Sequence, residues 1–219
     1  MIRTGQQTGR VRAPGGRRVT RTDQAHAHAG LSVGFSLVEL VVTLGICAAT
    51  VAMAVPLTTK AVDASRARAA AAFVGTRLRL ARQQAVMGGR SVGAVFDQTN
   101  GRWTFRICRD GNGNGLRRAD ILTQRDVCDD EAYDLARLFH GMAFDVDATL
   151  PGPDGDPPSA DPVMFGRSNV ASFSPDGGGT AGTVFLRSSR GEQYAIRVGN
   201  ITGRTRVLRF DAGSRRWVL

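Results

Sequence analysis

Histidine, cysteine and lysine are scarce in this chain of 219 residues, and each scarcity excludes a class of function. Three cysteines are too few for a disulfide-dense scaffold or for a zinc site built from four cysteines. Three histidines, of which His26 and His28 lie close to the N-terminus, leave little for histidine-based catalysis or metal binding. Lys60 is the only lysine, so arginine carries the basicity of the chain. Arginine-rich proteins often contact phosphate or carboxylate groups.

The formal net charge of +10 is distributed unevenly along the chain. Residues 1–34 and 35–96 each carry a net charge of +5, counted from their Arg, Lys, Asp and Glu residues. Residues 97–161 carry −6, and residues 162–219 carry +6. The chain therefore has a basic beginning, an acidic middle and a basic C-terminal end. Removal of the first segment would leave a chain of about +5.

A long apolar run follows a polar, arginine-rich leader. Residues 1–30 have no apolar periodicity, which indicates a flexible, positively charged segment. Residues 35–57 then contain one charged group, Glu39. As a helix they would extend about 34 Å, enough to cross a hydrocarbon core of about 30 Å. The basic flank predicts a single membrane pass with the N-terminus inside and the rest of the chain outside the cytoplasm.

The helical pattern continues beyond the apolar run, and a β pattern follows it. Apolar residues recur at spacings of three and four up to Gly88-Gly89, at Ala70, Phe73, Val74, Leu78, Ala81 and Ala85. After Gly89 the period is two, and we expect strands at 91–97, 102–108, 121–127, 138–146, 183–188, 193–198, 205–210 and 216–219. The fold class is therefore α+β, a long N-terminal helix packed on a β-rich head. The expected segments are a leader (1–34), a membrane-spanning part of the helix (35–57), an amphipathic part (58–88) and the head (89–219).

The segment Gly34-Phe35-Ser36-Leu37-Val38-Glu39 resembles the processing site of type IV pilins and type II secretion pseudopilins. The basic leader, the long apolar helix, Pro56 near its far end and the β-rich head agree with that resemblance. It implies that a prepilin peptidase cuts between Gly34 and Phe35 and that Phe35 is then N-methylated. It also implies that Glu39 directs assembly with other pilins or pseudopilins. A carboxylate within an apolar helix needs a partner, and the α-amino group of a neighbouring Phe35 is one. The alternative is a simple signal anchor.

The C-terminal half resembles the GspH/FimT family of minor pilins and pseudopilins, in Phe173-Ser174-Pro175-Asp176-Gly177, in 182–186 and in Gly203-Arg204-Thr205-Arg206. In FimT-type pilins a G-R-x-R stretch binds DNA during uptake, which implies DNA binding at Gly203, Arg204 and Arg206. On a strand the two arginines would share one face, and phosphate contacts would be independent of base sequence. Other arginines could help, namely Arg187, Arg190, Arg197 and Arg209. The alternatives are a solvated arginine-rich face and a surface that docks the acidic middle of a neighbouring subunit.

The loop that begins at Asp110 reproduces the first half of an EF-hand calcium loop. Its candidate ligands are Asp110, Asn112, Asn114 and Asp120, and the alternative is an Asn/Gly turn without a metal. Cys108 and Cys128 bracket this loop, and outside the cytoplasm a disulfide between them is permitted. Two free buried thiols are the alternative.

These patterns predict a minor pilin or pseudopilin that joins a type IV pilus-like filament and binds DNA for uptake. One alternative is a GspH-like tip pseudopilin of a type II secretion system, in which the arginine face is a protein interface. The other is a membrane-anchored enzyme, because G-x-S-x-G strings occur around Ser32 and Ser91. We expect no enzyme, since Ser91 lies between a helix and a strand, the reverse of a nucleophile elbow. The expected location is the inner membrane with a periplasmic head, and then a filament in the periplasm or at the cell surface.

Overall fold

The computed structural model describes residues 34–219, and for residues 53–57 it describes only the backbone. The expected leader therefore lies outside the described residues, apart from Gly34. The described residues divide into two units, one that ends at Ile46 and one that comprises Cys47–Leu219. The described part of the first unit is the beginning of helix α1 (Leu37–Gly88), and the second unit contains the rest of α1 and all the strands.

Helix α1 has 52 residues and ends at Gly88, where the glycine pair predicted an end. Gly89 has a φ of +61°, the left-handed conformation with which helices commonly terminate. The predicted apolar stripe is the buried face of the helix, since Ala70, Val74, Leu78, Ala81 and Ala85 are fully covered. Only Phe73 of that stripe is partly exposed, at the edge of the core.

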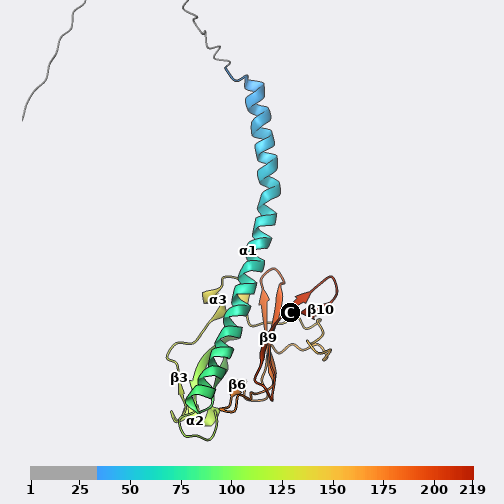
Figure 1. Ribbon diagram of the computed structural model, residues 1–219. Coiled ribbons are helices and arrows are strands. Elements are labelled where there is room, and N and C mark those ends of the chain that lie inside the picture. The colour runs from blue at the N-terminus through green and yellow to red at the C-terminus, as the bar shows by residue number, and fades with distance from the viewer. Residues whose placement is uncertain (1–33) are drawn as a thin grey trace, which may run out of the picture. The chain divides into compact units, whose positions relative to one another are not determined.

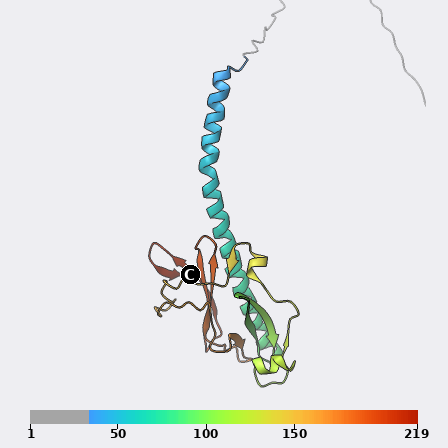
Figure 2. The ribbon, with the colours of Figure 1, turned by 180° about the vertical axis from the view of Figure 1, so that it is seen from behind.

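The head contains two antiparallel sheets. In the four-stranded sheet the order is β3-β2-β1-β6, formed by Val127–Cys128, Arg102–Arg109, Val92–Thr99 and Val170–Phe173. In the six-stranded sheet the order is β10-β9-β8-β7-β4, and β5 also pairs with β7. Its strands are β4 (Met142–Ala143), β5 (Val163–Met164), β7 (Gly182–Ser188), β8 (Gln193–Val198), β9 (Thr205–Asp211) and β10 (Arg216–Val218). Figures 1 and 2 show the C-terminal half of α1 alongside these strands. The α+β class is confirmed.

Close packing of α1 against the six-stranded sheet positions the site described below. A Cβ on Gly75 would lie 2.8 Å from Cγ2 of Val207 in β9, so a larger residue would push the helix from the strand. Leu78, Phe96, Phe105 and Ile196 belong to one buried cluster that joins the helix to both sheets. A second cluster lies on the opposite face of the six-stranded sheet and includes Phe185, Ala195, Leu208 and Trp217.

Two of the expected strands were wrong. Residues 121–127 were expected as a strand, but α2 (Arg118–Leu122) and a turn occupy most of that range, and only Val127 is in β3. Residues 138–146 were also expected as a strand, but α3 (Leu135–Leu138) ends there and β4 has two residues. Asp134 caps α3 by accepting a 2.9 Å hydrogen bond from Ala136 N. A polar cap outweighs the weak period-two pattern of a short apolar run.

Candidate functional site

The residues of the predicted processing site lie at the start of α1. Gly34, Phe35 and Ser36 precede the helix, and Ser36 O accepts the hydrogen bond of Leu40 N at 3.0 Å. Glu39 lies in the first helical turn and is exposed, where a carboxylate interacts favourably with the helix dipole. The structure therefore presents Phe35 and Glu39 on an accessible helix end.

Large apolar side chains cover the beginning of α1. More than half of the surface of each of these residues is exposed: Phe35, Leu37, Val38, Leu40, Val41, Val42, Leu44 and Ile46. A run of apolar surface of this kind marks a contact with another protein or a membrane. Among the residues that the structure describes, no helix is both long and apolar enough to cross a membrane. The expected span of 35–57 includes five residues, 53–57, whose side chains lie outside the described part.

An open depression of about 600 Å³ lies where α1 meets the loop before β9. We call it the arginine cup, and its lining residues are Arg79, Arg82, Gln83, Thr202, Gly203, Arg204 and Thr205. Arg79 and Arg82 are three residues apart on α1, so their side chains emerge from one face of the helix. Arg204 comes from the loop that leads into β9. The cup thus gathers three guanidinium groups from two segments that are far apart in the sequence.

Gly203 brings these two segments together. Its φ is +55°, and a Cβ there would lie 2.4 Å from Gly177 O and 2.9 Å from Arg82 Nε. Arg82 Nε also donates a 2.9 Å hydrogen bond to Gly177 O. A side chain at position 203 would therefore displace both the turn at Gly177 and the Arg82 guanidinium. The glycine of the G-R-x-R string has a structural role that the sequence alone did not show.

Arg204 and Arg206 do not both line the cup. Arg204 precedes β9 and lines the depression, whereas Arg206 lies within β9, opposite Arg197 of β8. Both side chains are exposed, and neither forms an ion pair with a carboxylate of the described chain. β9 begins at Thr205, so Arg204 lies one residue before it. Exposed Arg204, buried Thr205 and exposed Arg206 alternate as they would on a strand, and the shared face stays a prediction.

Three of the four predicted helper arginines pair with acidic residues of the same chain. Arg187 lies 3.5 Å from Asp145 and 3.8 Å from Asp147, measured between nitrogen and oxygen atoms. Arg197 pairs with Asp154, and Arg190 lies 3.6 Å from the buried Asp63. The fourth, Arg209, is exposed and forms no ion pair within the described residues. The acidic middle of the chain thus neutralises part of the C-terminal basic surface.

Comparison with known families bears on the class of the protein. A family model described as type II transport protein GspH matches residues 70–203. The chain belongs to the GspH family. GspH proteins are structural pseudopilins or minor pilins of type II secretion systems or type IV pili. No curated protein and no solved structure matches the chain. The matched range ends at Gly203 and begins after the apolar segment, so Gly34, Phe35, Glu39, Arg204 and Arg206 lie outside it.

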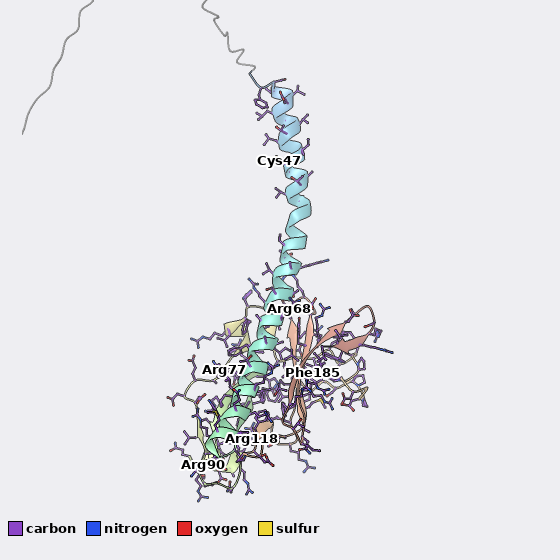
Figure 3. All side chains as sticks on the ribbon, in the orientation of Figure 1. Cys47, Arg68, Arg77, Arg90, Arg118 and Phe185 are labelled. Atoms are coloured by element: carbon purple, nitrogen blue, oxygen red, sulfur yellow. A yellow bond between two sulfur atoms is a disulfide. The ribbon has the colours of Figure 1, made fainter. Side chains whose placement is uncertain are left out.

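In this GspH-family chain, sequence reasoning missed Arg79 and Arg82 as members of the site. Their spacing of three beside the buried stripe was the available signal, because it places both at the border between the helix and the sheet. The neighbouring arginines of α1 differ. Arg77 lies over the rings of Phe73 and Tyr133 at 5.1 and 4.7 Å from their centroids. Figure 3 labels Arg68 and Arg77 on this part of the helix.

The predicted calcium loop is closed by hydrogen bonds within the protein. Asp110 is buried, and its carboxylate accepts hydrogen bonds from the backbone N–H of Asn112, Gly113 and Gly115 at 2.7–3.1 Å. The Asn114 side chain donates to Asp120 at 3.0 Å, and this bond lowers the pKa of Asp120. Within the described residues, no three His, Cys, Asp or Glu side chains are grouped as a metal site requires. Calcium binding therefore stays a prediction.

Cys108 and Cys128 are joined by a disulfide with an S–S distance of 1.96 Å. The two residues face each other across the β2–β3 pairing, which closes the loop between them. Ser91 lies between α1 and β1, and its carbonyl accepts a 2.8 Å hydrogen bond from Asp110 N. This arrangement is not the strand-to-helix turn of a nucleophile elbow. Ser32 lies outside the described residues.

Proposed function

We propose that the protein is a minor pilin or pseudopilin that a prepilin peptidase cuts between Gly34 and Phe35, with methylation of the new N-terminus. Glu39 then pairs with the α-amino group of a neighbouring subunit and sets the stagger of the helices. This pairing offsets the cost of a carboxylate on an apolar helix. The exposed apolar side chains at the start of α1 support the proposal, because lipid would cover them before assembly and other subunits afterwards. The head then faces the periplasm and later forms part of a filament.

We further propose that the head binds DNA through Gly203, Arg204 and Arg206, as expected of a pilin for DNA uptake. The observation that carries this proposal is the contrast between paired and unpaired arginines. Arg187, Arg190 and Arg197 have carboxylate partners, whereas Arg204 and Arg206 are exposed and have none in the described chain. Unpaired guanidinium groups remain available to phosphates.

The alternative is a tip pseudopilin of a type II secretion system that does not bind DNA. The description of the matching family and the neutralisation of three basic side chains favour it. In that case the exposed arginines contact acidic surfaces of other pseudopilins. The two functions differ in one measurable property, the affinity of the purified protein for DNA.

The test is fluorescence anisotropy of a labelled DNA duplex with the full chain in detergent micelles, at several salt concentrations. The double variant Arg204→Ala/Arg206→Ala is compared with Arg66→Ala/Arg68→Ala, which removes the same charge from exposed positions of α1. We expect the first variant to lose at least about tenfold in affinity and the slope of log K against log salt to fall by about 2. An equal loss in both variants, or no binding by the wild type, contradicts DNA binding at these residues.

A further inference from the structure

The arginine cup contains an unusual buried group. The Thr205 side-chain hydroxyl is buried and has no hydrogen-bond partner in the described structure. A buried polar group without a partner costs free energy, so such groups in folded proteins usually contact a water or an ion. Thr205 is also one of the residues that line the cup. The hydroxyl oxygen has almost no accessible surface, so the groups that the cup offers to a ligand are its three guanidinium groups.

The charges of the cup are not balanced from within the protein. No carboxylate lies within 4.0 Å of a guanidinium nitrogen of Arg79, Arg82 or Arg204 among the described residues. Arg82 uses its Nε for Gly177 O, which leaves its two terminal nitrogens to other acceptors. This hydrogen bond also holds the guanidinium group in one orientation. Positive charges gathered and oriented in this way, without a counter-ion, indicate a site for an anion.

We propose that the arginine cup binds one phosphate group of the DNA backbone, with Arg79, Arg82 and Arg204 as cationic ligands. The proposal rests on the proposed DNA binding and adds Arg79 and Arg82 to it. A backbone phosphodiester carries one negative charge on two non-bridging oxygens, and each oxygen can accept hydrogen bonds from more than one guanidinium group. The depression is open and large enough to admit the sugars on either side of the phosphate.

Because two of its arginines lie on a helix, the cup has a fixed geometry that a flexible basic loop lacks. Arg79 and Arg82 are fixed to α1, and Gly75 packs one turn away against Val207 of β9. The distance between the helix arginines and Arg204 is therefore set by the core of the head. Because less side-chain freedom is lost on binding, a phosphate held in the cup binds more tightly than one held by the same number of surface arginines.

The test uses the same anisotropy assay on the full chain in detergent. Arg79→Ala/Arg82→Ala is compared with the charge-matched Arg66→Ala/Arg68→Ala, which lies about three helical turns away. We expect about a tenfold loss of DNA affinity and a decrease of about 1 in the salt slope, both larger than in the control. Arg79→Ala alone is the variant that leaves the Arg82–Gly177 hydrogen bond intact, and it should lose affinity without a change in melting temperature.

The outcomes separate this inference from the proposed function. Suppose that Arg204→Ala/Arg206→Ala weakens DNA binding but Arg79→Ala/Arg82→Ala has the same affinity as its charge-matched control. The proposed DNA binding then stands, and the phosphate site in the cup is refuted. If inorganic phosphate raises the melting temperature more than chloride at equal ionic strength, but DNA does not bind, the cup takes free phosphate and the DNA assignment is overturned. Salt-sensitive self-association without DNA binding would mean that the cup binds an acidic surface of a second copy. This result would also overturn the DNA assignment.

Discussion

The Ser188 hydroxyl on β7 donates a 2.6 Å hydrogen bond to the carboxylate of Asp63 on α1, 125 residues earlier in the chain. Asp63 is buried, and the Arg190 guanidinium lies 3.6 Å from its other oxygen. The Ser188 oxygen also accepts the backbone N–H of Arg190 and of Glu192 in the turn between β7 and β8. One carboxylate thus links the helix to a strand and to the turn that follows it.

We predict that Asp63→Ala lowers the free energy of unfolding by about 1–3 kcal/mol, because the Ser188 hydroxyl loses its buried acceptor. Asp63→Asn keeps an acceptor oxygen and should lose less. Glu131→Ala removes a carboxylate from an exposed ion pair and serves as the control, with little expected effect. Thermal unfolding of the full chain measures all three. An Asp63→Ala variant as stable as the wild type would rule out this link as a source of stability.

The disulfide should stabilise the head by limiting the unfolded chain. Cys108 and Cys128 are 20 residues apart, and the chain-entropy model gives about 3 kcal/mol for a loop of this length. The double variant Cys108→Ala/Cys128→Ala should therefore melt several degrees lower than the wild type. Cys47→Ala, at the one free cysteine of the described residues, should not change the melting temperature. Equal melting temperatures for the double variant and the wild type would contradict the prediction.

Processing can be tested at Gly34 without disturbing the fold. A Cβ on Gly34 would have no atom within 4 Å, so Gly34→Ala is tolerated in the described structure. We expect this variant to keep its leader when expressed with the prepilin peptidase, because the proposed site requires a small residue before the cut. Gly45→Ala is the matched control, since its Cβ would also be free of contacts, and it should be cut normally. The mobility of the chain on a gel reports both results, and complete cutting of Gly34→Ala would be the contrary one.

The turn beside the arginine cup should be sensitive to acid. The Ser174 hydroxyl and the backbone N–H of Gly178 donate to Asp176 and hold the pKa of its carboxyl below the ordinary value of 3.8. Because the folded pKa is depressed, this contribution to stability is present above that ordinary value and is lost as the pH falls through the folded pKa. Ser174→Ala should raise the pKa of Asp176, which a carboxyl NMR titration measures. The melting temperature of Ser174→Ala should be lower than that of the wild type near neutral pH and should approach the wild-type value in strong acid. A gap that persists in acid would mean that the hydroxyl acts independently of the carboxylate charge.

Chelation tests the proposed calcium loop. If Asp110, Asn112, Asn114 and Asp120 bind calcium, EDTA lowers the melting temperature and added calcium restores it. Asp120→Asn should abolish the response, whereas Asp156→Asn, at an exposed carboxylate of another loop, should retain it. A melting temperature that is the same with calcium and with EDTA would contradict calcium binding by this loop.

The sequence predicted the long elements well because their patterns are long. The stripe from Ala70 to Ala85 has enough turns to establish a helical period, and β8 coincides with the expected strand at 193–198. The Asn100-Gly101 hairpin was also predictable, since both residues have positive φ values, at which Asn and Gly are favoured. Short elements were not predictable in the same way. The polar cap of α3 at Asp134 decides its structure, and no apolar pattern reports it.

The arginine cup could be predicted only in part. Arg204 was expected from the G-R-x-R string, but the contribution of Arg79 and Arg82 depends on the packing of Gly75 against Val207, which is a contact between distant segments. The pairing of Arg187 with Asp145 and Asp147 depends on the path of the loop after β4. Net charge by segment therefore overstated how much positive charge is free to bind a ligand.

The hydrogen bond from Arg82 to Gly177 makes the cup a property of the folded head and not of any continuous stretch of sequence. A synthetic peptide that copies residues 203–216 would carry five arginines but would lack the helix side of the cup. Peptide arrays and deletion mapping would therefore underestimate binding at this site. Conversely, if the proposed DNA binding occurs, its loss during gentle unfolding should coincide with separation of α1 from β9, so bound DNA would report on that interface.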